Sequence, residues 1–259
     1  MIIRKSAREI EKIAAAGALV AETIDHVGSL IVPGITTAEL DRAAGDFIRA
    51  RGGVPTSYGY KGYPAAICIS PNDVVVHGIP GEYEVAEGDL VTIDVGATVD
   101  DYIADSAYTF SVGEIDEEAQ RLLDTGQESL AAGIEQARVG NRVEDISYAV
   151  QTVVEDAGFS VVRSLVGHGV GRHYHEDPHV PNFGQPGRGP RLSAGMTIAI
   201  EPMITAGGDK VVVEGDEWTI RTADGSLSAH FEHTVAITDE GPRILTPRVG
   251  VAARGPVVR

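Results

Sequence analysis

The feature that most constrains this 259-residue chain is a short strand pattern that occurs twice and ends each time in a carboxylate. The first copy reads EGDLVTID and ends at Asp94, and the second reads AGMTIAIE and ends at Glu201. A glycine stands at the second position of both copies. We therefore interpret residues from about 10 to 95 and from about 117 to 202 as two copies of one structural unit.

Side chains alternate between the two faces of a strand, so each copy separates its apolar residues from its carboxylate. Val91 and Ile93 share one face of the first strand, and Asp94 lies on the other. The second copy repeats this arrangement around Glu201. A two-fold pairing of the halves would bring both carboxylates to a shared interior, where their charges need a cation.

Apolar residues at helical spacing predict four helices, and each unit reads as a helix, a glycine turn, a second helix and then strands. A closing strand is predicted over residues 227–238, and the segment 246–259 has no periodicity and is predicted to be a flexible tail. We expect one domain over residues 1–259. The predicted helices span residues 6–30, 37–51, 117–137 and 143–157.

Composition narrows the classes of function. A hydrophobic content of 43% is ample for a core, and a net charge of −17 argues against nucleic acid or anionic lipid as a partner. The single cysteine, Cys68, excludes an internal disulfide. Charges interrupt the N-terminal residues and no 18-residue apolar stretch occurs, so we expect a soluble, cytoplasmic protein without a membrane partner.

Three further candidate ligands are Asp105, His168 and Glu232. Asp105 follows Asp94 closely enough for a hairpin, turning at residues 99–101, to place the two side by side. Four carboxylates packed without cations would have their pKa values raised by ~3–5 units. Two divalent ions would cancel the four charges, lie ~3.5–4 Å apart and activate a shared water.

A surface role is the simpler interpretation for any one of the 38 acidic residues, because carboxylates are seldom buried unpaired. Asp94 and Glu201 differ from that background since each interrupts an apolar strand pattern. His168 lies among glycines and valines, which suits a ligand, although a histidine packed in the core remains the alternative.

Five motifs together carry a family resemblance: TIDVG at 92–96, ADS at 104–106, GHGVG at 167–171, IEP at 200–202 and FEHT at 231–234. In this order and spacing, over residues 4–245, the chain resembles the type I methionine aminopeptidases. That family has the pita-bread fold shared with prolidase and creatinase. The resemblance implies an α+β fold in which two halves, related by a pseudo-two-fold axis, form an antiparallel sheet covered by helices.

The resemblance also implies roles for individual residues. His77 is placed near the scissile amide nitrogen and His175 near the carbonyl oxygen, where both would donate hydrogen bonds as an oxyanion forms. Glu201 would shuttle a proton while a hydroxide bound to both metals attacks the peptide carbonyl. The dinuclear metal ligands would be Asp94, Asp105, His168, Glu201 and Glu232, with Asp105 and Glu232 bridging.

The resemblance also implies a pocket for the methionine side chain, lined by an aromatic group with one thiol. Aromatic faces and sulfur contact a thioether favourably, by ~0.3–1.5 kcal/mol. For the two tyrosines of the 60–63 loop, simple loop packing is the alternative. The residues assigned to substrate binding are Tyr60, Tyr63, Cys68, His77, Tyr174, His175 and Trp218.

Three histidines depart from the family pattern: His173, His179 and His230. Relatives often have Gly, Gln and Gln at these places, and none of the three is a family ligand. We expect neutral or solvated side chains, with a mild pH effect or an auxiliary-metal effect as the alternative.

The resulting hypothesis is a catalytic domain that removes the initiator methionine from nascent polypeptides with a small second residue. A proline dipeptidase is the first alternative, although those relatives usually carry a further N-terminal domain. A non-catalytic peptide-binding module is the second, although such modules lose metal ligands. The metals are two divalent ions, and the ligand types leave Mn, Fe, Co and Zn open. We expect a monomer, and the sequence leaves transient docking on the ribosome open.

Overall fold

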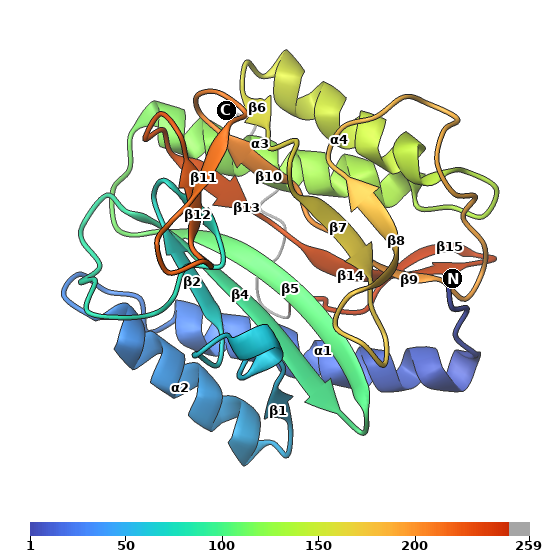
Figure 1. Ribbon diagram of the computed structural model, residues 1–259, viewed down its shortest axis with the longest axis horizontal. Coiled ribbons are helices and arrows are strands. Elements are labelled where there is room, and N and C mark those ends of the chain that lie inside the picture. Colours follow the sequence, from blue (N-terminus) through green and yellow to red (C-terminus); the bar gives the residue numbers. More distant parts are fainter. Residues whose placement is uncertain (249–259) are drawn as a thin grey trace, which may run out of the picture.

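The computed structural model describes residues 1–248 (Figure 1). Its α-helices lie where the sequence predicts them, and within the described residues none is long and apolar enough to cross a membrane. A short 3-10 helix, η1 (Tyr60–Gly62), lies in the loop after the first helix pair. The α-helices are α1 (Ala7–Gly28), α2 (Thr37–Ala50), α3 (Glu117–Gln136) and α4 (Val143–Asp156).

Side-chain caps explain where the first two helices begin. The Ser6 hydroxyl accepts a hydrogen bond from the backbone N–H of Glu9, whose carboxylate accepts from the Ser6 backbone N–H. Thr36 and Glu39 repeat this reciprocal arrangement at the start of α2. Such a capping box satisfies two of the N–H groups that a helix end leaves free.

The strands form two larger and two smaller sheets, and every pairing among the described residues is antiparallel. The first larger sheet contains β1 (Val54–Pro55), β2 (Cys68–Pro71), β4 (Leu90–Val99) and β5 (Tyr102–Ser111). The second contains β7 (Val166–Gly169), β8 (Glu176–Pro181), β9 (Thr197–Ile200), β14 (His233–Thr238) and β15 (Gly241–Ile244). The smaller sheets contain β6 (Ser160–Val161), β10 (Met203–Thr205) and β13 (Ser228–His230), and β3 (Val74–Val76), β11 (Val211–Val213) and β12 (Ile220–Thr222).

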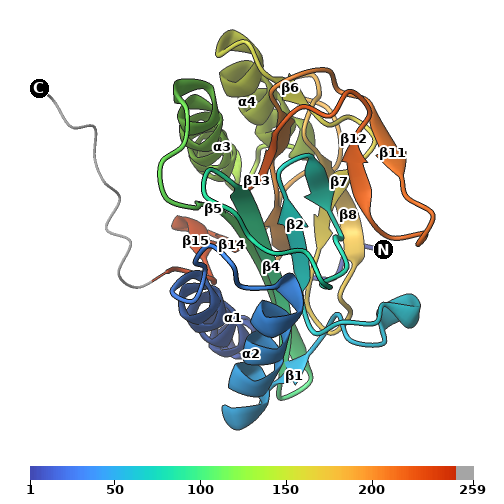
Figure 2. The same cartoon turned by 90° about the vertical axis from the view of Figure 1, so that its left-hand side faces the viewer.

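Two hydrophobic cores lie between the helices and the sheets. The first joins α1 and α2 to β4, with Ile13 and Ile93 both fully buried. The second joins α3 and α4 to β9, through residues such as Leu122 and Ile198. Figure 2 shows α1 and α3 on the same side of the sheets, with β11, β12 and η1 toward the other side. The helices therefore cover the apolar faces of β4 and β9, and Asp94 and Glu201 face away from them.

The hairpin of β4 and β5 sets two of the predicted ligands side by side, as the sequence predicts. Asp100 and Asp101 have φ values of 48° and 66°, the left-handed conformation that a two-residue hairpin turn requires. Asp94 pairs with Ala107, and Gly96 pairs with Asp105. Both carboxylates therefore project from one face of the hairpin, on neighbouring strands.

Strand β5 also joins the first half of the chain to the residues that precede β14. The Glu232 backbone N–H donates to the Ala107 carbonyl at 2.9 Å, and the Ser106 hydroxyl donates to the Glu232 carbonyl at 2.5 Å. The Thr234 hydroxyl bonds to both the N–H and the carbonyl of Asp105, at 3.0 and 2.8 Å. This seam brings Asp105 and Glu232 together from distant parts of the sequence.

The C-terminal part of the fold differs from its prediction. The predicted strand 227–238 is two strands, because the chain leaves the ladder between His230 and His233 and so turns Glu232 toward Asp105. The sequence also gave no indication of β15, which pairs with β14.

The predicted flexible tail was wrong over its first three residues. Thr246 is fully buried, and its hydroxyl lies within hydrogen-bond distance of the Thr234 backbone N–H and of His233 Nδ1. Arg248 pairs with Asp25 of α1 at 2.6 Å. The rest of the predicted tail, 249–259, lies outside the described residues.

The internal repeat within one domain stays a prediction, and the order of elements supports it. Each half begins with two helices joined by a glycine turn, at Gly34 in the first half and at Gly140 in the second, with φ values of 92° and 100°. Gly88 and Gly195, before the two carboxylate strands, have φ values of 90° and 92°. A two-fold superposition of residues 10–95 on 117–202 should place Asp94 on Glu201.

Phe231 should be a main contributor to stability. Its ring is 1% exposed and packs edge-on against Tyr108, with centroids 5.0 Å apart. Replacing Phe231 with Ala should lower the free energy of unfolding by about 3–5 kcal/mol, because a cavity opens in the core. Urea unfolding measures the change, with the exposed Val213→Ala as the matched control. A loss below about 1 kcal/mol would show that this packing is not needed.

Candidate metal centre and substrate pocket

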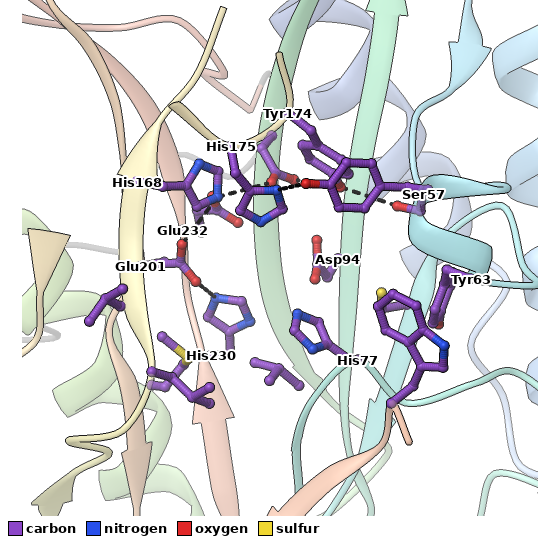
Figure 3. A pocket seen from close by; sticks show the side chains of 18 of the residues that line it. Ser57, Tyr63, His77, Asp94, His168, Tyr174, His175, Glu201, His230 and Glu232 are labelled. Atoms are coloured by element: carbon purple, nitrogen blue, oxygen red, sulfur yellow. Dashed lines mark hydrogen bonds and ion pairs between the residues drawn. The ribbon is translucent and has the colours of Figure 1, made fainter. Parts of the chain in front are cut away.

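One cavity of about 190 Å³ lies between the two carboxylate strands (Figure 3). In the close view, His168, Glu201 and Glu232 gather on one side of the cavity, and Tyr63 lies on the opposite side. All the residues that the sequence analysis proposed for the site line it: Tyr60, Tyr63, Cys68, His77, Asp94, Asp105, His168, Tyr174, His175, Glu201, Trp218 and Glu232.

The predicted metal ligands converge at the seam. Ligand atoms of Asp105, His168 and Glu232 all lie within 4.8 Å of one another. His168 Nε2 is 3.5 Å from Glu201 Oε1 and 3.8 Å from Asp105 Oδ2. Asp94 projects from β4 into the same space.

The tautomer of His168 indicates whether the cluster could bind a cation. Its Nδ1 is 2.9 Å from the Gly169 carbonyl oxygen, which can only accept, so Nδ1 carries the proton. Its Nε2 points toward two carboxylates, Glu201 at 3.5 Å and Asp105 at 3.8 Å. An N–H bonded to a backbone carbonyl is also the usual outer contact of a metal-binding histidine. The donor set therefore fits a cation.

Burial raises the pKa of every carboxyl group in the cluster. It raises the pKa of Glu201 to about 7 and that of Asp94 to about 6, where the charge of Glu201 adds to the effect. The pKa values of Asp105 and Glu232 are raised well above their usual range by burial and by the neighbouring carboxylates. Glu232 Oε1 is buried without a hydrogen-bond partner. Divalent cations would remove both the repulsion and the unmet hydrogen-bonding requirement.

The backbone holds His77 in a strained position at the cavity. Its φ is 58°, which is uncommon for a residue other than glycine and occurs often at functional sites. The next residue must be glycine, because a Cβ on Gly78 would lie 2.2 Å from the Ile69 carbonyl oxygen. Burial lowers the pKa of His77 to about 4, so its ring is neutral at pH 7.

His175 lies at the mouth of the cavity, on the turn before β8. Its Nδ1 is 2.9 Å from the Tyr60 hydroxyl, and its ring is 4.2 Å from that of His168 between centroids. Burial is the main cause that lowers the pKa of His175, to about 3, and the neighbouring His168 is the second. The ring is therefore neutral, and one nitrogen remains free to donate a hydrogen bond.

The proposed methionine pocket has two walls. The Tyr63 and Trp218 rings meet edge to face at 5.1 Å, with Cys68 packed beside Tyr63, and these three residues form the first wall. Tyr60 and Tyr174 form the second wall, at 5.2 Å from each other. Trp218 is thereby half-buried although charged residues surround it in the sequence.

Tyr174 lies closer to the metal ligands than the sequence analysis implied. Its hydroxyl is 3.1 Å from Ser57 Oγ and 3.5 Å from Asp105 Oδ1. Gly96 makes room for it, because a Cβ there would lie 2.3 Å from the Tyr174 hydroxyl. Tyr174 therefore contacts the predicted metal ligand Asp105 as well as forming part of the proposed pocket wall.

The three unusual histidines differ in their surroundings. His173 and His179 are exposed, as expected of solvated side chains. His230 is 2% exposed, lines the cavity, and has its Nε2 3.6 Å from Glu201 Oε2, with no hydrogen-bond partner for either ring nitrogen. Burial lowers its pKa to about 4, so it is neutral but not solvated.

Sequence reasoning did not place several residues in the cavity. His230 could have been found, because it precedes the Phe231–Glu232 pair and alternation sets it on the same face as Glu232. The apolar lining had no such signal, since an apolar residue beside a motif can equally belong to the hydrophobic core. The apolar residues missed are Val76, Leu165, Val166 and Met203, and the polar ones are Ser57 and Lys61.

Comparison with known proteins identifies the class of this site. The model of metallopeptidase family M24 matches residues 11–239, and the chain belongs to that family. It is 52% identical to a methionine aminopeptidase of Clostridium perfringens over 95% of this chain and 99% of the relative. It is 49% identical to methionine aminopeptidase 1 of Mycobacterium tuberculosis, over 95% of each chain.

Solved structures agree with this assignment. The methionine aminopeptidase of Thermotoga maritima superposes with a TM-score of 0.93 at 45% identity, covering 95% of this chain and 99% of that one. The prolidase of Pyrococcus furiosus has a TM-score of 0.76 at 22% identity, and this chain covers 65% of it, so that likeness concerns the fold alone. The predicted pita-bread fold and the predicted resemblance to type I methionine aminopeptidases are confirmed.

Without metal, stability should fall as pH rises above about 6.5. The unfolded chain has released its carboxyl protons there, since their ordinary pKa is ~4. In the folded chain Glu201 has a pKa of about 7, and the pKa values of Asp105 and Glu232 are raised well above their usual range, so these groups retain protons. Stability therefore falls as pH rises through the folded pKa. Buried histidines act in the opposite direction, but only below about pH 6.5, the ordinary histidine pKa.

Thermal unfolding from pH 6.5 to 8 measures this effect. The melting temperature of chelated protein should fall across the range, and added Mn²⁺ should flatten the curve because a metal ligand is bound deprotonated. A chelated protein whose melting temperature stays constant or rises would contradict the raised pKa values.

Proposed function

We propose that this chain is a methionine aminopeptidase that hydrolyses the bond after the N-terminal methionine of nascent polypeptides. The observation that carries the proposal is the position of His168 Nε2, 3.8 Å from Asp105 and 3.5 Å from Glu201 within a largely buried set of four carboxylates. An aromatic pocket adjoins this set. The high identity to methionine aminopeptidases over nearly the whole chain supports the same activity.

Five residues would hold two divalent cations: Asp94, Asp105, His168, Glu201 and Glu232. By the family resemblance, Asp105 and Glu232, which meet at the seam, would be shared by both ions. Bound there, the ions would acidify a water molecule and polarise the peptide carbonyl. The donor set admits Mn, Fe, Co or Zn.

Glu201 is suited to move a proton. Its carboxylate lines the cavity beside His168, at 3.5 Å, where it could take up and return the proton of a bound water. We assign to Glu201 the proton of the attacking water, which it then delivers to the leaving amine. Asn182 donates to the backbone carbonyl of Glu201 at 3.0 Å and keeps the residue at the end of β9.

The two neutral histidines are suited to donate hydrogen bonds to the substrate. When the Tyr60 hydroxyl donates to His175 Nδ1, the proton of the His175 ring is on Nε2. That N–H would stabilise the oxyanion that forms on the carbonyl. His77, beside Trp218 at 6.2 Å between ring centroids, would contact the amide nitrogen and limit the size of the second residue.

The two alternatives fit the observations less well. A proline dipeptidase shares the fold, but the solved prolidase is longer and only 22% identical. A peptide-binding module without activity would not need four buried carboxylates, because their burial is costly unless a cation is bound.

The proposed substrate indicates where in the cell the protein acts. New polypeptides are made in the cytoplasm, so we place the protein there, as a monomer. The net charge of −17 disfavours direct contact with nucleic acid or membranes. Transient docking on the ribosome is compatible with this setting and needs a binding assay.

Substrate choice tests the proposed activity. Met-Ala-Ser should be the best of three peptides, because methionine fills the pocket and each unburied methylene costs ~0.8 kcal/mol. Met-Leu-Ser should be poor, since leucine crowds His77, and Ala-Pro should hardly react. The measurement is kcat/KM for each peptide with Mn²⁺ or Co²⁺. Preference for Ala-Pro would favour the dipeptidase, and no cleavage with any divalent metal would favour the binding module.

Two substitutions separate metal ligands from hydrogen-bond donors. Asp105→Ala should abolish turnover and lower the metal content, because the residue would contact both ions. His175→Ala should lower kcat by ~10²–10³ and leave the metal content unchanged, as for an oxyanion donor. Elemental analysis with steady-state kinetics makes the comparison. Retained activity in Asp105→Ala, or metal loss in His175→Ala, would contradict the assigned roles.

A further inference from the structure

In the turn that carries Tyr174 and His175, one side chain accepts hydrogen bonds from two backbone N–H groups. Glu176 Oε1 accepts from the backbone N–H of Arg172 at 2.9 Å and from that of His173 at 3.1 Å. Both residues are exposed and lie outside any strand. The Glu176 carboxylate thus fixes the path of the chain directly before His175.

The second oxygen of the same carboxylate is held from the other end of the sequence. Glu176 Oε2 accepts from Lys5 Nζ at 2.6 Å, and each of the two side chains is only 4% exposed. Lys5 is itself held to the fold, because its backbone N–H donates to the Gly195 carbonyl at 2.6 Å. Figure 2 shows the N-terminus beside β8, which begins with Glu176.

The backbone of the turn packs closely against this ion pair at Gly171. A Cβ on Gly171 would lie 2.6 Å from Lys5 Cε and 2.8 Å from Glu176 Oε1. A charge buried without its partner is strongly unfavourable, so loss of Lys5 should drive Glu176 toward solvent or force it to take up a proton. Either change weakens its bonds to the turn, and the turn can then shift.

We propose that Lys5, acting through Glu176, is a positioning residue for the reaction. The ion pair holds the 171–175 turn so that the His175 ring stays against Tyr60 and over the metal ligands. This inference rests on the proposed function, because its readout is cleavage of a methionyl peptide. Lys5 contacts neither the cavity nor its ligands, so its effect must pass through the turn.

The test compares kcat and KM for Met-Ala-Ser among Lys5→Met, His175→Ala and the double variant. Lys5→Met should lower kcat by about 10- to 100-fold, the loss expected of a displacement near 1 Å, with little change in KM or metal content. The double variant should be no slower than His175→Ala alone. Displacement of the His175 ring cannot lower kcat further once that ring has been removed. Lys210→Met, at an exposed lysine, is the matched control and should keep the activity of the parent.

Two conservative variants keep the test decisive if Lys5→Met fails to fold by circular dichroism. Lys5→Arg preserves the charge and should retain most of kcat, whereas Glu176→Gln removes the charge and should lower kcat without metal loss. An inactive parent protein would refute the proposed function and not this inference. An active parent in which Lys5→Met and Glu176→Gln keep full kcat, or in which the losses from Lys5→Met and His175→Ala multiply, would overturn it.

Discussion

Repulsion among four buried carboxylates is the constraint on which the rest of this structure depends. Asp94, Asp105, Glu201 and Glu232 share one water-poor space, and burial raises the pKa of each. Left uncompensated, the cluster would oppose folding at neutral pH. The ring of His168, held by the Gly169 carbonyl, adds a fifth ligand atom to the cluster. Affinity for divalent cations and the proposed chemistry therefore have the same physical origin.

The fold supplies the energy that holds these groups together. Each carboxylate strand buries its other face against a helix pair, so the two hydrophobic cores stabilise the strands that present Asp94 and Glu201. The seam hydrogen bonds between β5 and the residues before β14 then fix Asp105 against Glu232. The break in the strand at Phe231 serves the same arrangement. The Phe231 ring packs in the core, and Glu232, the next residue, turns toward the site.

Local pattern predicted what is encoded locally. Alternation predicted the direction of Asp94, and the spacing predicted its hairpin with Asp105, because both depend on neighbouring residues. Pairings between distant segments had no such signal. The buried contact of Lys5 with Glu176, strand β15 and the packing of Thr246 all depend on which segments meet in three dimensions, as does the cavity position of His230.

Anomalous X-ray scattering from crystals soaked in Mn²⁺ tests the central claim most directly, because it locates cations independently of activity. Two peaks about 3.5–4 Å apart should appear, the spacing expected of ions that share carboxylate ligands. Both should contact Asp105 and Glu232, with one also reaching His168 and Glu201 and the other Asp94. A saturated crystal with one peak, or with peaks outside this cluster, would contradict the account.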